Sequence, residues 1–211
     1  NNVPSITNLD RMEDKKQLAS EKSVVNYGFF MGATAENLEE LNTVENVCGI
    51  KIFMGSSTGD LLVDSSEAIE KIFANGSRLI AVHAEDESLL KINKELFKDF
   101  SDIRLHSLIR NESVALSATK LAVKLSLQYK RRLHILHLTT EDECDLLRTI
   151  PRDNLITAEV CPQNFTLTTP NCYEKLGTLA QMNPPIRSKL HADALWKGLK
   201  DRVIGCIATD H

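Results

Sequence analysis

The chain has 211 residues, of which 42% are hydrophobic and 26% are charged, and its formal net charge at pH 7 is −4. These values are ordinary for a globular domain and exclude a disordered or fibrous chain. The sequence pI of about 5.9 and the lack of a clustered basic segment argue against a nucleic-acid partner. No stretch approaches 18 consecutive apolar residues, so we expect neither a membrane-spanning helix nor a membrane partner.

Strand-like and helix-like segments alternate along the chain. Short apolar runs predict strands at residues 23–31, 48–54, 78–83, 132–138, 155–161 and 203–209. Apolar residues at helical spacing predict helices at residues 35–41, 66–74, 85–97, 112–129, 140–149 and 191–199. Residues 162–187 are rich in proline, and we expect a long irregular excursion there.

The five cysteines are odd in number and form no Cys-x-x-Cys pair. This pattern disfavours a disulfide framework and predicts a reducing compartment, the cytoplasm. The N-terminal residues show no basic-then-apolar signal pattern, and the first residue is not Met. We therefore expect these residues to be part of a longer polypeptide.

Apolar strands separated by helices indicate a parallel α/β sheet, either an open doubly wound sheet or a (β/α)8 barrel. His83, His137 and Asp210 lie at or just beyond the C-terminal ends of predicted strands, where barrel active sites are found. The glycine-rich phosphate-binding motifs of open sheets are absent. A whole barrel takes about 250 residues. We therefore predict that residues 1–211 form one partial barrel domain.

Lys51 lies inside an apolar predicted strand, where an unpartnered ammonium group is costly. It therefore needs a carboxylate neighbour, a lowered pKa or covalent modification. A single histidine at a strand end is more often structural than a ligand, but Lys51, His83, His137 and Asp210 together predict a metal site. Imidazole and carboxylate groups suit zinc, and a carbamate formed from lysine and carbon dioxide can bridge two cations.

Six short segments, in this order, resemble sequence blocks of the dihydroorotases of the amidohydrolase superfamily. They are Lys-Ile-Phe-Met-Gly-Ser-Ser-Thr-Gly at 51–59, Val-His-Ala-Glu at 82–85, Leu-His-Leu-Thr-Thr at 136–140, Glu-Val-Cys-Pro at 159–162, Met-Asn-Pro-Pro-Ile-Arg at 182–187 and Ile-Ala-Thr-Asp-His at 207–211. The resemblance spans essentially the whole chain and implies a partial (β/α)8 barrel, about strands three to eight. The family's His-x-His pair on the first strand, and the arginine after it, are absent from these residues.

The resemblance implies that Lys51 is N-carboxylated and bridges one or two zinc ions per subunit. It implies that His83 and His137 bind the second cation. Asp210 would bind the first cation and act as general base and then general acid. The implied reaction is the reversible conversion of L-dihydroorotate and water to N-carbamoyl-L-aspartate, a step of pyrimidine synthesis. A small-molecule substrate and a homodimer are the implied partners.

Further side chains receive weaker assignments. The resemblance implies that Asn1 and Asn183 bind substrate. Arg187 either contacts an anionic substrate or anchors the excursion, and we favour anchoring. We expect His134 to lie on the opposite strand face from His137 and to be structural, because strand side chains alternate. His106, Arg110 and Glu112 match a family segment and are expected to brace the site without taking part in chemistry.

Two rival functions stay open. One is another cyclic amidase, such as a dihydropyrimidinase or allantoinase, although the Gly-Ser-Ser-Thr-Gly turn at 55–59 is less typical of those groups. The other is a non-catalytic dihydroorotase-like scaffold that has lost metal ligands. The family's missing first strand would discriminate between enzyme and scaffold.

Overall fold

A computed structural model describes residues 2–55, 61–151 and 155–210. Within these residues, six parallel strands form one sheet in which spatial order follows chain order. The strands are β1 Phe30–Gly32, β2 Gly49–Phe53, β3 Ile80–His83, β4 Leu133–Ile135, β5 Ile156–Val160 and β6 Cys206–Ile207. A doubly wound sheet reverses its strand order at a switch point, whereas a (β/α) barrel adds each strand beside the previous one. The order β1 to β6 is therefore that of a barrel.

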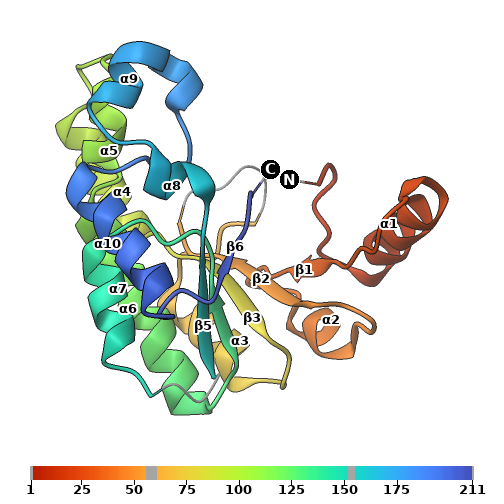
Figure 1. Cartoon of the computed structure of the whole chain (residues 1–211). Helices are drawn as coiled ribbons and strands as arrows, with labels where there is room; N and C mark the ends of the chain where they lie inside the picture. Colours follow the sequence, from red (N-terminus) through yellow and green to blue (C-terminus); the bar gives the residue numbers. More distant parts are fainter. Residues whose placement is uncertain (1, 56–60, 152–154, 211) are drawn as a thin grey trace.

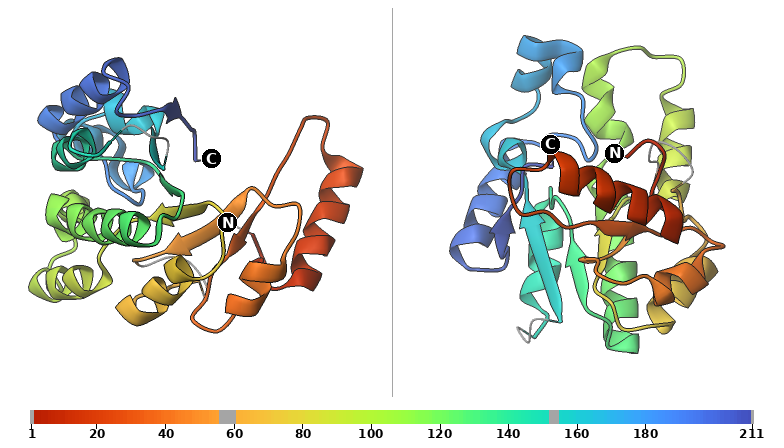
Figure 2. Two further views of the ribbon diagram at one scale, coloured as in Figure 1. Left: turned by 90° about the horizontal axis from the view of Figure 1, so that it is seen from below. Right: turned by 90° about the vertical axis from the view of Figure 1, so that its right-hand side faces the viewer.

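The helices are α1 Leu9–Lys22, α2 Leu38–Thr43, α3 Ser66–Ala74, α4 Glu87–Leu96, α5 His106–Ile109, α6 Glu112–Tyr129, α7 Glu141–Arg148, α8 Pro162–Thr166, α9 Asn171–Leu176 and α10 Lys189–Lys200, with 3₁₀ turns η1 at Ile103–Leu105 and η2 at Gly177–Ala180. Helices α3, α6, α7 and α10 pack side by side along the outside of the curved sheet (Figures 1 and 2). Helix α1 stands apart, beyond the β1 edge (Figure 2). No helix in the described part of the chain has the length and hydropathy needed to cross a membrane.

Local sequence explains where the main helices begin. Ser65, Asp86 and Asn111 each accept a hydrogen bond from a backbone N–H in the first turn of the following helix. Thr140 and Glu143 form a capping box at the start of α7. Such caps satisfy N–H groups that have no partner within the helix, and each contributes about 1 kcal/mol.

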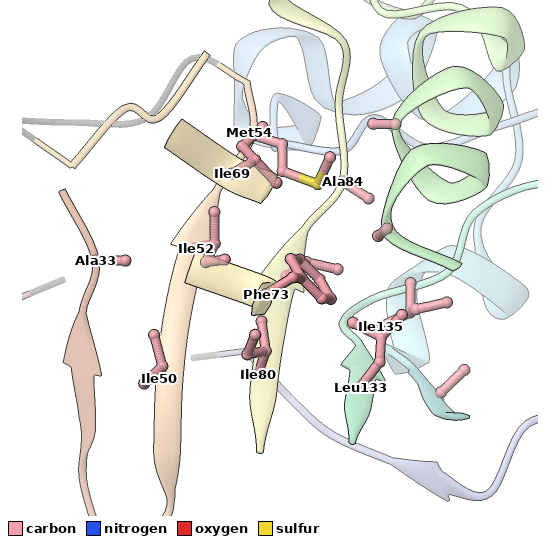
Figure 3. Close-up of a cluster of buried hydrophobic side chains, with 14 of the residues drawn as sticks. Ala33, Ile50, Ile52, Met54, Ile69, Phe73, Ile80, Ala84, Leu133 and Ile135 are labelled. Atoms are coloured by element: carbon pink, nitrogen blue, oxygen red, sulfur yellow. The ribbon is translucent and has the colours of Figure 1, made fainter. Parts of the chain in front are cut away.

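The hydrophobic core lies between the sheet and its helices. The strand register places Ile50, Ile80 and Leu133 in one row across β2, β3 and β4. These side chains are at most 1% exposed, and they pack in the same core as Phe73 of α3 (Figure 3). Because side chains alternate along a strand, the neighbouring row faces the other way.

That neighbouring row consists of Lys51, Ala81 and His134, which are register partners across the same three strands. We call this side of the sheet the inner face. In a complete (β/α)8 barrel, side chains of this side fill the interior, and the active site lies above them at the carboxyl ends of the strands. The fold therefore directs the polar residues of the strands away from the helices.

The predicted α/β class and partial-barrel architecture are confirmed, and the bounds of α3 and α6 are those predicted. The strand predicted at 23–31 is wrong for most of its length, because only its last two residues belong to β1. Val24 is 97% and Val25 72% exposed, so the first part of this apolar run is not packed into the core. Helix α1 was missed, and the irregular excursion at 162–187 contains α8, α9 and η2.

Candidate metal centre

Two histidines meet at the carboxyl end of the sheet. His83 is the last residue of β3, and His137 lies two residues beyond the end of β4. His83 Nδ1 is 3.0 Å from His137 Nε2, and both side chains are buried. Burial, together with the charges of His83 and Lys51, holds the pKa of His137 well below its ordinary value. His137 is therefore neutral at pH 7, which is the form that binds metal ions.

Lys51 lies on the inner face of β2, with its Nζ atom 4.5 Å from the centre of the Phe53 ring. Burial lowers the pKa of Lys51 to about 8, against the opposing effect of the Asp210 and Glu159 carboxylates. About a tenth of this amine is therefore unprotonated at pH 7. An unprotonated amine is the form that reacts with carbon dioxide.

Asp210 lies three residues beyond β6, on an exposed segment. It is close enough to raise the pKa of Lys51 by charge and to contribute to a raised pKa, about 12, of the buried Cys161 thiol. Asp210 and His137 have φ values of 51° and 39°. Left-handed backbone is uncommon outside glycine and concentrates at functional sites. The chain adopts it at two of the four predicted ligands.

Glu85 was not assigned a role from sequence, yet it holds His83 in place. The Glu85 side chain is fully buried, and its Oε2 atom is 2.8 Å from His83 Nε2. Arg110 forms an ion pair with the same oxygen. Burial alone would raise the pKa of Glu85, but the bond and charge of His83 and the charge of Arg110 lower it overall. An ionised Glu85 accepts the Nε2 proton of His83, so that Nδ1, which faces His137 Nε2, carries the lone pair that a cation would bind.

Arg187 anchors the loops around this centre. It is 1% exposed, its Nε atom is 3.3 Å from Thr139 Oγ1, and its Nη1 atom donates to the carbonyl oxygens of Arg110 and Ser107. These contacts agree with the anchoring role favoured from sequence. They also tie the loop that carries Arg110 to the segment that follows His137.

Of the two residues predicted to bind substrate, Asn183 lies within the described part of the chain and Asn1 does not. Asn183 is exposed and hydrogen-bonds His106, whose Nε2 atom is 2.8 Å from the carbonyl oxygen of Met182. His106 is also influenced by the charges of Arg110 and Glu85, so this rim adjoins the buried network. Asn1 lies outside the described residues, as do residues 56–60 of the turn after β2.

The expectation that His134 and His137 lie on opposite faces is wrong. His134 is the register partner of Ala81, which alternates with His83 on the inner face. His137 contacts His83 and therefore also lies on that face. The reason is that β4 ends at Ile135 and the positive φ of His137 interrupts the two-residue alternation.

The donor set fits a divalent metal centre. Two imidazoles meet through ring nitrogens, a carboxylate lies within electrostatic reach, and a lysine with a lowered pKa lies beside them. Nitrogen and oxygen donors of this kind suit zinc and related cations. Lys51, His83, His137 and Asp210 are the residues that would hold them.

The chain resembles curated cyclic amidohydrolases over its whole length. A dihydroorotase from Methanosarcina mazei is 33% identical, with 100% of this chain and 48% of the relative aligned. An allantoinase from Streptomyces avermitilis is 30% identical, with 100% of this chain and 47% of the relative aligned. No family model matches the chain. The chain thus spans about half the length of the curated relatives it matches.

Solved structures show the same architecture. The L-hydantoinase (dihydropyrimidinase) from Arthrobacter aurescens superposes with a TM-score of 0.92 at 24% identity, over 99% of this chain and 48% of that chain. An inactive dihydroorotase-like domain of a multifunctional protein from Chaetomium thermophilum gives 0.67 at 16% identity, over 97% of this chain and 50% of that chain.

Together, the fold and the similarities define the class: the chain has the partial-barrel fold of the solved hydantoinase, and its curated relatives include dihydroorotases and an allantoinase, which are hydrolases of cyclic amides. Within that class, curated dihydroorotases are homologues of this chain along its full length.

Proposed function

We propose that the protein is a metal-dependent dihydroorotase, which interconverts L-dihydroorotate and N-carbamoyl-L-aspartate in cytoplasmic pyrimidine synthesis. Residues 1–211 would form one partial barrel domain of it. The observation that carries the proposal is the meeting of the buried His83–His137 pair with Lys51, whose pKa is lowered to about 8. Zinc held by these residues and Asp210, with Lys51 N-carboxylated, accounts for a lysine kept inside an apolar strand.

When bound, the cations supply Lewis acidity that polarises the ring amide carbonyl and lowers the pKa of water. His137 remains neutral, and the bond to Glu85 orients His83. In the hydrolytic direction a water oxygen bonds to the carbonyl carbon, and the bond between that carbon and the ring nitrogen breaks. Asp210 accepts the water proton and delivers it to the departing nitrogen. Asn183, on the exposed rim, would hydrogen-bond the substrate.

The substrate is tested with the full-length natural polypeptide, loaded with zinc in bicarbonate buffer. We expect turnover of L-dihydroorotate to exceed that of hydantoin and of allantoin by at least about 100-fold in kcat/KM, since a site built for a carboxylate discriminates strongly against substrates without one. Loss of turnover in the Asp210→Asn variant would show that the measured activity belongs to this site. Preferential turnover of hydantoin would contradict the substrate assignment.

An allantoinase is the second candidate, because a curated allantoinase aligns with the whole chain at 30% identity. Preferential turnover of allantoin in the same assay would establish it. Absence of both metal and turnover in the full-length protein would instead support a non-catalytic scaffold. Retention of Lys51, His83, His137 and Asp210 argues against the scaffold.

A further inference from the structure

A second group of metal-ligating side chains lies on the inner face, on β4, β5 and β6. His134 is the register partner of Thr157, and Glu159 is the register partner of Cys206. One ligand atom from each of His134, Glu159 and Cys206 lies within 4.8 Å of the other two, the only such group of three found among the described residues. None of these residues belongs to the centre proposed above.

Each ring nitrogen of His134 lies beside a side-chain oxygen of β5. Nδ1 is 2.8 Å from Thr157 Oγ1, whose hydroxyl lies 3.4 Å from the carbonyl oxygen of Leu133. When that hydroxyl donates to the carbonyl, its oxygen accepts the Nδ1 proton. In that tautomer the lone pair of Nε2 faces Glu159 Oε2, 3.0 Å away. In this tautomer a cation between Nε2 and Oε2 would satisfy both acceptors, whereas in the other tautomer the Nε2 proton does so in the cation-free chain.

The donor types and spacing favour a cation. Imidazole nitrogen, carboxylate oxygen and thiolate sulfur form a mixed set that suits zinc. Ligands about 2.0 and 2.3 Å from a tetrahedral centre lie roughly 3.3 to 3.5 Å apart, and the His134–Glu159 separation is close to that spacing. The bond from His134 Nδ1 to Thr157 is the outer-shell contact that orients a metal-binding imidazole.

We propose that His134 Nε2, the Glu159 carboxylate and Cys206 Sγ bind a zinc ion that is separate from the catalytic cations. Binding displaces the thiol proton of Cys206 and forms a zinc–sulfur bond, without any redox change. Three protein ligands leave one position for water.

The position of the proposed zinc ion, between β4, β5 and β6, favours a structural role. Strand β6 has two residues, Cys206 and Ile207, and both are exposed. Asp210 follows on the same segment and depends on β6 for its place beside Lys51. A cation bound by side chains of three neighbouring strands clamps β6 to β5 and β4. It thereby positions Asp210 without touching the substrate.

Cobalt tests the proposal because a cobalt–thiolate bond produces a charge-transfer absorption band, and none of Lys51, His83, His137 and Asp210 offers sulfur. Burial and the charge of Glu159 raise the pKa of the cation-free Cys206 thiol, so a band reports binding. The full-length protein is stripped with chelator and titrated with cobalt. We expect the band in the wild type and its persistence in Lys51→Ala, which separates this result from the proposed catalytic function.

Two serine variants locate the sulfur. Cys206→Ser is expected to abolish the band and to bind one cobalt ion fewer per chain. Cys161→Ser is the matched control, because this buried thiol lies near Asp210, and it should keep both. X-ray absorption on the zinc-loaded wild type requires no variant and should show a zinc–sulfur shell. The proposal is overturned by an absent band, by a band that survives in Cys206→Ser, or by a wild-type spectrum without sulfur.

Discussion

Two almost fully buried arginines lie at opposite ends of the parallel strands. Arg131 is 2% exposed, precedes β4, and donates to the backbone carbonyls of Asn75 and Arg78, which precede β3. Arg187 is 1% exposed and donates to the backbone of Arg110 and to the side chain of Thr139, beyond the carboxyl ends of the strands. Each guanidinium therefore joins segments that are distant in sequence.

The electrostatic surroundings of the two arginines differ. Burial lowers the pKa of both, and the neighbouring charge of Arg78 lowers the pKa of Arg131 further. For Arg187 the effect of burial is opposed by carboxylates, chiefly Glu112, Glu143 and Glu85. At the amino end of the sheet, backbone carbonyls alone thus accept hydrogen bonds from the Arg131 guanidinium. At the carboxyl end, carboxylates surround Arg187 and the proposed metal ligands lie nearby. This is the division between stability and function expected of a (β/α) barrel.

The largest expected effect lies at the carboxyl end. Asp210→Asn removes the proposed proton carrier, and general acid–base groups contribute about 10² to 10⁴ in rate. We expect kcat for dihydroorotate in the zinc-loaded, full-length protein to fall about 1,000-fold. Asp193→Asn, which removes an exposed carboxylate of α10, should leave kcat within about twofold. A variant Asp210→Asn within tenfold of the wild type would refute the assigned role.

The next test compares the arginines themselves. Arg131→Met and Arg187→Met each leave buried carbonyl groups without a donor, and each should lower the free energy of unfolding by about 3 kcal/mol. Urea denaturation measures this loss. At a temperature where both variants stay folded, kcat should fall at least about tenfold in Arg187→Met and stay within about twofold in Arg131→Met. Equal losses of kcat would show that the two ends do not divide function from stability.

Glu85→Gln gives a smaller effect at the carboxyl end. The amide keeps the shape of Glu85 but removes the charge that orients His83, and losing such an outer-shell partner costs about 10- to 100-fold in metal affinity. Competition with a coloured chelator measures zinc affinity directly. Glu112→Gln is the matched control, because Glu112 pairs with His191, 3.3 Å away, and not with a predicted metal ligand. Equal affinities in the two variants would contradict the role of Glu85.

Elements with clear caps and periodic apolar residues could be predicted from local sequence, whereas elements without these signals could not. Helices α3 and α6 have sharp caps at Ser65 and Asn111 followed by periodic apolar residues, so their bounds could be predicted. Helix α1 buries Met12 alone, and its polar composition carries little periodic signal. The run at 23–31 has strand propensity, but whether a partner strand lies beside it is a tertiary property.

The candidate site likewise has residues that the sequence predicts and contacts that it does not. His83, His137 and Asp210 could be recognised because the carboxyl ends of parallel strands converge on one rim. Lys51 could be recognised because an ammonium group inside an apolar strand is costly. The contact of Glu85 with Arg110 joins residues 25 positions apart, and only the folded chain reveals it. The prediction that His134 and His137 lie on opposite faces is wrong because His137 has a positive φ. No glycine or asparagine at this position indicates such a backbone conformation. A sequence shows which side chains reach the rim, but not how they contact one another there.

The smallest expected effect concerns the pH dependence of stability, and it separates Lys51 from Arg131. The pKa of Lys51 is about 8 in the folded metal-free chain, below the ordinary lysine value of 10.5. Between these values the unfolded state binds more protons, so the free energy of unfolding rises with pH. From pH 8 to 9 the gain is about 1 kcal/mol.

Urea denaturation of the metal-free, full-length protein in carbonate-free buffer measures this gain. It should vanish in Lys51→Met, whose apolar side chain does not titrate. It should persist in Arg131→Met, because Arg131 stays charged over this range, so its removal changes stability without changing the slope. A slope that survives in Lys51→Met would mean that another group at the carboxyl end titrates in its place. The lowered pKa would then no longer account for a lysine inside β2.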